Sequence, residues 1–269
     1  MEKRASLQTG RDGNQGEIVQ LYQKLSKDRR IQVKLHGDTS VVFPTENGIP
    51  QGSILSPTLF NIYTSNRSDI LANLGIQHAM YADDLTLWYN SPNLAHAARK
   101  VQTALDKIGN WSDIWGLQFT PTKSKAIIFT TRRPNSVPKV YFQHTAIKQV
   151  KYHTLLGLHL DSRLTWKIYV QQLKITTARR MNIINYLSGK DWGGDRATLL
   201  SIYKMWIRPK IEYGAPLFTT AASTTLRQLD TIQNTCVRAS IGALRCTKTL
   251  RLNLEAGVPS LQDRRAYLL

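Results

Sequence analysis

Two adjacent carboxylates, Asp83 and Asp84, are the residues whose types and spacing most directly suggest chemistry. Residues 79–81 are predicted to form one short strand and residues 85–89 a second, because aromatic and β-branched side chains favour strands. The chain must turn at or near Ala82-Asp83, which places both carboxylates at the tip of a hairpin.

Carboxylates held this close together repel each other, and a divalent cation relieves the repulsion. Mg²⁺ takes few protein carboxylates and completes its octahedron with water and substrate phosphates. The pair therefore suits metal-dependent phosphoryl transfer. The alternative is an ordinary polar turn, in which aspartate is common.

The charge of the chain favours a polyanionic partner. Lys and Arg number 36 against 18 Asp and Glu, which gives a net charge of +18. Residues 121–190 contain thirteen Lys or Arg and only one acid, Asp161, so we expect one basic face. Nucleic acid fits this charge better than an anionic membrane surface does, and a basic solubilising surface is the alternative.

Two motifs together indicate a family. The sequence YADD at residues 81–84 resembles the YxDD box of reverse transcriptases, and NGIPQGSILSPTLFN at residues 47–61 resembles a second motif of the same family. Their order and spacing resemble those of non-LTR (LINE-type) retrotransposons, jockey-like elements in particular, over residues 22–269. The resemblance implies an RNA-directed DNA polymerase that uses Mg²⁺, with Mn²⁺ as a possible substitute. Its partners would be an RNA template, a DNA primer, the RNA–DNA duplex and deoxynucleotides.

The resemblance assigns roles residue by residue. Asp83 and Asp84 match the metal-binding catalytic pair. The residues that match nucleotide- or template-binding positions are Pro50, Gln51, Gly52 and Tyr81. From the residues alone, the glycine-rich stretch around Gly52 is a shaped loop before a helix, and a purely structural loop is the alternative.

Two further stretches resemble the family. Lys123, in GLQFTPTKSK at residues 116–125, matches a lysine thought to protonate the leaving pyrophosphate; a solvated surface lysine is the alternative. Leu156 and Gly157, in LLGLHLDSRLTW at residues 155–166, match the turn of the primer grip. Glycine there would let a nucleic-acid backbone approach closely, and an ordinary β-hairpin is the alternative.

The predicted fold class is α+β. We expect a right-hand polymerase palm, made of a small antiparallel sheet backed by helices, followed by a helical thumb-like region. The predicted divisions are a flexible tail at 1–16, a partial palm at 17–165 with fingers and first palm strand mostly missing, and the thumb-like region at 166–269. The strands expected before the second motif are 31–35, half-buried by alternation, and 41–43, joined at Gly37-Asp38.

Apolar periodicity predicts the helices. Ser56 and Ser91 are the expected N-terminal caps of two of them, Gly116 ends the second, and Pro209 stops a later one. The expected helical ranges are 17–27, a helix from Ser56, a long helix from Ser91 to Gly116, 168–187, 199–207 and 226–241.

A third carboxylate motif that the resemblance leads us to expect, of the form DxxxAFD, is missing from the sequence. We therefore expect an N-terminally truncated copy that is inactive as a polymerase. The alternatives are a catalytically silent, basic nucleic-acid-binding remnant and a fragment that cannot fold.

The cysteines suggest neither zinc nor redox chemistry. The spacing of Cys236 and Cys246 fits no metal or CxxC pattern, and Cys236 is expected to be a buried free thiol. This usage, with no signal peptide or transmembrane segment in the sequence, predicts an intracellular location, nuclear or cytoplasmic.

Overall fold

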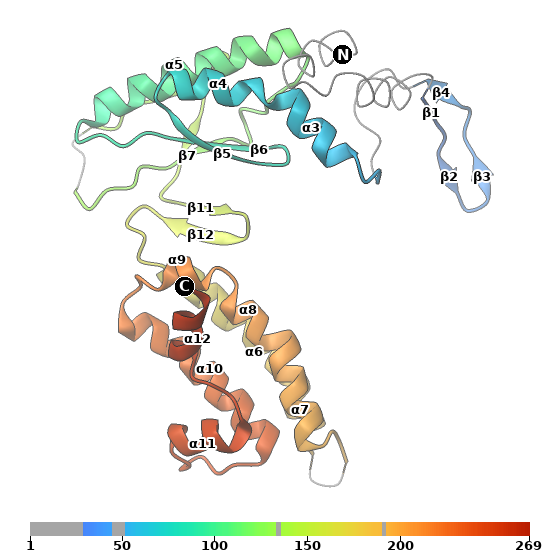
Figure 1. Cartoon of the computed structure of the whole chain (residues 1–269), viewed down its shortest axis with the longest axis vertical. Helices are drawn as coiled ribbons and strands as arrows, with labels where there is room; N and C mark the ends of the chain where they lie inside the picture. Colours follow the sequence, from blue (N-terminus) through green and yellow to red (C-terminus); the bar gives the residue numbers. More distant parts are fainter. Residues whose placement is uncertain (1–28, 45–51, 133–135, 190–191) are drawn as a thin grey trace. The chain divides into compact units, whose positions relative to one another are not determined.

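The computed structural model describes residues 29–44, 52–132, 136–189 and 192–269. The chain divides into two compact units, one formed by residues 1–126 and 134–149 and the other by residues 127–133 and 150–269. The predicted tail at 1–16 and helix at 17–27 lie outside the described residues. Figure 1 shows the elements of both units in chain order.

The first unit combines short strands with three described helices. Its elements are β1 (Arg30–Ile31), β2 (Lys34–Leu35), β3 (Asp38–Thr39), β4 (Phe43–Pro44), α3 (Ser56–Thr64), α4 (Asn66–Asn73), β5 (Gln77–Tyr81), β6 (Asp84–Trp88), α5 (Leu94–Trp115), β7 (Lys125–Ala126), β8 (Tyr141–Phe142), β9 (Thr145–Ala146) and β10 (Lys148–Gln149).

The strands β1 to β4 form one long hairpin, with β2 paired to β3 and β1 to β4. Its turn falls at His36-Gly37, both with positive φ, one residue earlier than predicted. The predicted half-buried face is wrong, because Ile31, Val33 and Leu35 are each more than half exposed. Alternation of apolar and polar residues shows which side chains share a face, but it does not supply the surface that would cover them.

The single antiparallel sheet that we predicted is not present in the described residues. Their strands pair only in twos: five ladders are antiparallel, and β7 pairs with β10 in parallel. Most of these strands are two residues long, which is too short to recruit a further neighbour. The coarser prediction of mixed helices and small sheets is confirmed.

Helices α4 and α5 build the core of the first unit. Leu71 of α4 packs with Ala104 and Ile108 of α5, and Leu85 and Leu87 of β6 lie against this cluster. The helical stripe predicted for α5 is confirmed at Ala104 and Ile108, and Gly116 ends the helix in the left-handed conformation.

Both predicted serine caps were misplaced. Helix α3 already includes Ser56, because Leu55 before it is in the helical region at φ −83°, ψ −15°. In α5 the cap is Asn93, whose Oδ1 accepts a hydrogen bond from the His96 backbone N–H at 3.1 Å. Ser91 Oγ instead accepts a hydrogen bond from the backbone N–H of Asn93, the residue directly before the helix, at 3.2 Å.

The second unit is a hairpin followed by helices. Its elements are β11 (Tyr152–Leu155), β12 (Leu158–Asp161), α6 (Lys167–Leu187), α7 (Arg196–Ile202), the π-helical turn η1 (Tyr203–Ile207), α8 (Arg208–Glu212), α9 (Ala215–Phe218), α10 (Ser223–Ile241), α11 (Thr249–Ala256) and α12 (Leu261–Leu268). Helices α6 and α10 match the predicted ranges closely. Among the helices of the described residues, none combines the length and apolar character needed to cross a bilayer.

A large apolar core holds these helices together. It includes Tyr169 and Leu173 of α6, Leu229 and Cys236 of α10, and Leu252 of α11. Cys236 is a buried free thiol, as predicted, and burial raises its pKa to about 12. The thiol is therefore uncharged at neutral pH.

Pro209 does not stop the helix, contrary to our prediction. The chain passes from α7 through η1 into α8, and Pro209 lies in the first turn of α8. The Arg208 backbone N–H donates to the Tyr203 carbonyl, five residues back, which is the wider π-helical spacing. Because a wider turn precedes the proline ring, the ring does not end the helical path.

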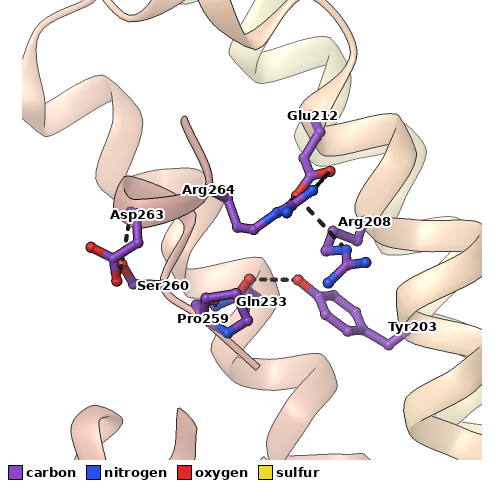
Figure 2. Close-up of polar contacts among 8 residues, drawn as sticks. All are labelled: Tyr203, Arg208, Glu212, Gln233, Pro259, Ser260, Asp263 and Arg264. Atoms are coloured by element: carbon purple, nitrogen blue, oxygen red, sulfur yellow. Dashed lines mark hydrogen bonds and ion pairs between the residues drawn. The ribbon is translucent and has the colours of Figure 1, made fainter. Parts of the chain in front are cut away.

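Buried and half-buried polar contacts connect α12 to the helices before it (Figure 2). Arg264 donates two hydrogen bonds to Glu212, from Nε to Oε1 at 2.7 Å and from Nη2 to Oε2 at 3.0 Å. The Tyr203 hydroxyl donates to Gln233 Oε1 at 2.6 Å, and Gln233 Nε2 donates to the Pro259 carbonyl at 3.0 Å. These contacts join η1, α8 and α10 to the segment that carries α12.

We expect Arg264→Ala to lower the free energy of unfolding by about 2 kcal/mol, because it leaves the poorly solvated Glu212 carboxylate without its bidentate partner. Arg196→Ala is the matched control. Its pair with Glu255 is exposed on both sides and should be worth at most about 1 kcal/mol. Chemical denaturation of the full chain measures both, and equal losses would contradict a special role for the pair with Glu212.

Candidate active site

The two aspartates lie at the tip of the β5–β6 hairpin, as predicted. Tyr81 of β5 pairs with Asp84 of β6, so that Ala82 and Asp83 form a two-residue turn between them. Tyr81, Asp83 and Asp84 are all exposed. The strand predicted at 85–89 begins and ends one residue earlier, at Asp84–Trp88.

The direction of the β6 side chains is set by the core of the first unit. Leu85 and Leu87 pack against the cluster formed by α4 and α5. Because successive side chains of a strand point to opposite faces, Asp84 points away from that cluster. A shift of one residue in the pairing would turn Asp84 towards the core and the leucines towards solvent.

The turn itself is strained. Ala82 has φ +50°, a region that alanine rarely adopts. Such a residue typically costs about 1–3 kcal/mol and persists only where its surroundings enforce it. Here the Tyr81–Asp84 pair closes a two-residue turn, which places both carboxylates at an exposed tip.

The pair offers two ligands to a metal ion, and the described part of the chain does not supply a third. No group of three or more His, Cys, Asp or Glu residues that could hold a metal occurs among those residues. Two exposed carboxylates at a hairpin tip fit a Mg²⁺ ion that takes its other ligands from water and phosphate. They do not by themselves form a closed metal cage.

The other residues predicted for this site can be located only in part. Pro50 and Gln51 lie outside the described residues. Gly52 is exposed with φ +87°, which fits the shaped loop expected there. Lys123 is exposed in a turn that precedes β7, and its backbone N–H donates to the Thr120 carbonyl at 3.2 Å. This hydrogen bond is local and does not connect Lys123 to Asp83 or Asp84.

The predicted primer-grip residues form the two-residue turn of the β11–β12 hairpin in the second unit. Leu155 pairs with Leu158, and Leu156 and Gly157 between them have φ +46° and +81°. Leu156 is 45% exposed. The face of Gly157 that a Cβ would occupy is covered by the Tyr213 ring, whose Cε1 would lie 3.4 Å away.

Asp161 connects this hairpin to α6, a role that our sequence analysis did not assign. Its Oδ2 accepts from the backbone N–H of Arg163 at 3.3 Å and of Thr165 at 3.0 Å, and its Oδ1 accepts from the Trp166 backbone N–H at 3.0 Å. Burial tends to raise the pKa of this carboxyl, but these hydrogen bonds outweigh burial and hold the pKa below its usual value. An aspartate shortly before a helix was the signal that could have identified it.

Some of the basic side chains of α6 are available to a ligand. Lys174 and Arg179 are exposed. Arg180 is used within the unit, because its guanidinium carbon lies 5.2 Å from the centroid of the Trp206 ring and its Nη1 donates to the Trp206 carbonyl.

The comparisons with known proteins agree with the motifs. The family model for reverse transcriptase (RNA-dependent DNA polymerase) matches residues 13–187. An RNA-directed DNA polymerase from mobile element jockey of Drosophila funebris is 26% identical over 92% of the chain and 28% of its own length. A probable RNA-directed DNA polymerase from transposon BS of Drosophila melanogaster is 29% identical over 79% of the chain and 24% of its own length.

A third relative gives the same result. A probable RNA-directed DNA polymerase from transposon X-element of Drosophila melanogaster is 26% identical over 82% of the chain and 25% of its own length. The chain thus spans about a quarter of the length of these curated relatives.

We expect Asp161→Asn to lower the free energy of unfolding at pH 7 by about 1 kcal/mol, because the half-buried charge is partly screened by water. An aspartate with a lowered folded pKa stabilises fully above its unfolded pKa of about 3.9 and loses this contribution as the pH falls through the folded pKa. The difference between wild type and variant should therefore shrink below about pH 4.

Denaturant unfolding at pH 7 and pH 3 measures this difference. Asp38→Asn, at an exposed aspartate of β3, is the control and should change little at either pH. A loss that is the same at pH 3 as at pH 7 would show that the Asp161 charge is not responsible.

Proposed function

The chain belongs to the reverse transcriptase (RNA-dependent DNA polymerase) family, and we propose that it supplies the palm and thumb regions of an enzyme that copies an RNA template into DNA. In this proposal residues 17–165 are the partial palm and residues 166–269 the thumb-like region. One observation carries the proposal: the YADD sequence forms a tight hairpin tip that exposes both Asp83 and Asp84.

The proposed chemistry is nucleotidyl transfer to a primer 3′-hydroxyl. Asp83 and Asp84 would hold the divalent ion, Mg²⁺ with Mn²⁺ as a substitute. Such an ion polarises phosphate oxygens and promotes deprotonation of the attacking hydroxyl. Exposure of both carboxylates supports this role, because their free lone pairs can face an ion and its phosphates.

The remaining roles follow from the family resemblance. Pro50, Gln51, Gly52 and Tyr81 would position the deoxynucleotide or template. Lys123 would neutralise the leaving pyrophosphate or donate a proton to it, a role that suits its exposed ammonium group. The turn at Leu156-Gly157 would contact the primer, and its exposed apolar tip is compatible with that role.

A second function is favoured by the charge of the chain. The net charge of +18 supports binding to a polyanion regardless of catalysis. The chain would then be a silent RNA–DNA-binding remnant.

Primer extension on an RNA template separates the two functions. We expect the 269-residue chain to bind the duplex but to extend it at least about a thousandfold more slowly than a complete site would, since lacking a bridging carboxylate costs roughly 4 kcal/mol in the transition state. The assay is run in Mg²⁺ and in Mn²⁺ beside Asp83→Asn, with Asp69→Asn on α4 as the charge-matched control.

Robust extension that disappears in Asp83→Asn alone would contradict the silent remnant. Manganese binding is measured separately, by electron paramagnetic resonance. If Asp83→Asn leaves manganese binding unchanged, the aspartate pair is not the metal site, whatever the extension assay shows.

Salt dependence of duplex binding tests the exposed basic side chains of α6. We expect Lys174→Gln and Arg179→Gln each to reduce the slope of log Kd against log salt by roughly 0.7–0.9, the value for one lost phosphate contact. Arg196→Gln, in the exposed pair with Glu255, is the control and should leave the slope unchanged. If Lys174→Gln and Arg179→Gln change the slope no more than Arg196→Gln does, α6 is not a phosphate-binding surface.

A further inference from the structure

The turn at Leu156-Gly157 rests on a segment far along the chain within the same unit. The Tyr213 hydroxyl donates a hydrogen bond to the Leu156 carbonyl. The Tyr213 ring lies beside Gly157: an added Cβ would lie 3.4 Å from Cε1 of the ring, an ordinary van der Waals distance. Tyr213 thus hydrogen-bonds one residue of the turn and lies beside the other.

The next residue reinforces this contact. Gly214 has φ +72°, and a Cβ added there would lie only 2.5 Å from Cδ2 of Leu158. Leu158 is the first residue of β12, directly after the turn. Glycine is therefore favoured at 214 by the positive φ, and any side chain there would have to displace the side chain of Leu158. Residues 213–214 thus pack against residues 156–158.

Tyr213 is itself held at its backbone and ring. Its carbonyl accepts from the hydroxyl of Tyr169, a buried residue of α6, at 2.7 Å. Its backbone N–H donates to the Pro209 carbonyl at 3.0 Å. Lys210 Nζ lies 5.8 Å from the centroid of its ring. The two backbone contacts fix the main chain from which the Tyr213 side chain reaches the turn.

The geometry points to Tyr213 as a positioning residue that sets the conformation of the Leu156-Gly157 turn for the primer terminus. Leu156 has φ +46°, a region that costs a leucine energy and needs enforcement by its surroundings. The hydrogen bond from Tyr213 to the Leu156 carbonyl supplies part of that enforcement. Tyr213 lies beyond residue 187, where the match to the family model ends.

This inference rests on the proposed role of the turn as the primer grip. It adds that the helical segment after residue 187 acts directly on that grip. The required observation is therefore a selective effect on the primer end, separate from any effect on folding or on general duplex binding.

The test uses Tyr213→Phe in the full chain, which removes only the hydroxyl. Fluorescence anisotropy compares two probes, an RNA–DNA hybrid with a recessed DNA 3′ end and a blunt hybrid of equal length. We expect the preference for the recessed end to fall about fivefold, the factor expected for one lost hydrogen bond, with blunt-end affinity unchanged. Hydrogen exchange should become faster in residues 152–161.

Two variants serve as controls. Tyr267→Phe makes the same change at an exposed tyrosine of the same unit, which also has a cation over its ring, Arg264 Cζ at 5.4 Å from the centroid. It should alter neither the end preference nor the exchange of residues 152–161. Leu156→Ala removes the exposed tip of the turn itself and should lower the end preference directly.

The outcomes separate the two claims. If Leu156→Ala lowers the preference but Tyr213→Phe does not, the primer grip stands and the positioning role of Tyr213 is overturned. If wild type has no preference for the recessed end, or Leu156→Ala leaves the preference intact, the primer-grip assignment itself fails, and the inference fails with it. A thermal midpoint of Tyr213→Phe within about 3 °C of wild type shows that the change in binding is not general unfolding.

Discussion

The packing of the half-buried Leu85 and Leu87 is the constraint on which the proposed catalytic tip depends. Both side chains pack on a core formed by α4 and α5, and a strand has no freedom to rotate one residue without rotating all of them. The outward direction of Asp84 is thus a consequence of apolar burial on the opposite face of β6. The charged residues contribute nothing favourable to this placement, since two adjacent carboxylates repel each other. Hydrophobic packing must offset both that repulsion and the strain of the Ala82 turn.

In the second unit, hydrogen bonds rather than apolar packing hold the strained hairpin turn. Its hairpin turn is also short and has positive φ at a non-glycine residue, Leu156. Here polar contacts hold the ends: Asp161 binds three backbone N–H groups where the hairpin leads into α6, and Tyr213 binds the turn. Directional hydrogen bonds suit this task, because an exposed turn has too little buried apolar surface to be fixed by packing.

Sequence patterns predicted well those features that depend on local periodicity. The stripes of α5 and α10 and the YADD hairpin follow from helical or alternating spacing, which shows directly which face is apolar. Prediction was wrong where two local signals compete. Ser91 and Asn93 are both good caps, and the structure uses Asn93. Pro209 looked like a helix stop, but the π-helical turn before it lets the helix continue.

Features that depend on long-range contacts could not be predicted from local pattern. Tyr213 and Leu156 are 57 positions apart, and Arg264 and Glu212 are 52 apart. Nothing in the spacing of such residues indicates that they touch. The family motifs guided us to the turn but not to its support, because the family match ends at residue 187 and the supporting residues follow it.

Binding and catalysis place different demands on this chain. Attraction to a polyanion needs only an excess of positive charge, which falls off gradually as single residues change, since each phosphate contact adds separately. Metal-dependent transfer needs ligands converging on one point, and losing one of them removes most of the rate at once. A chain can therefore keep its fold and its affinity for a duplex while its catalytic rate depends on a single further carboxylate. For this reason the YADD tip identifies the family more securely than it establishes turnover.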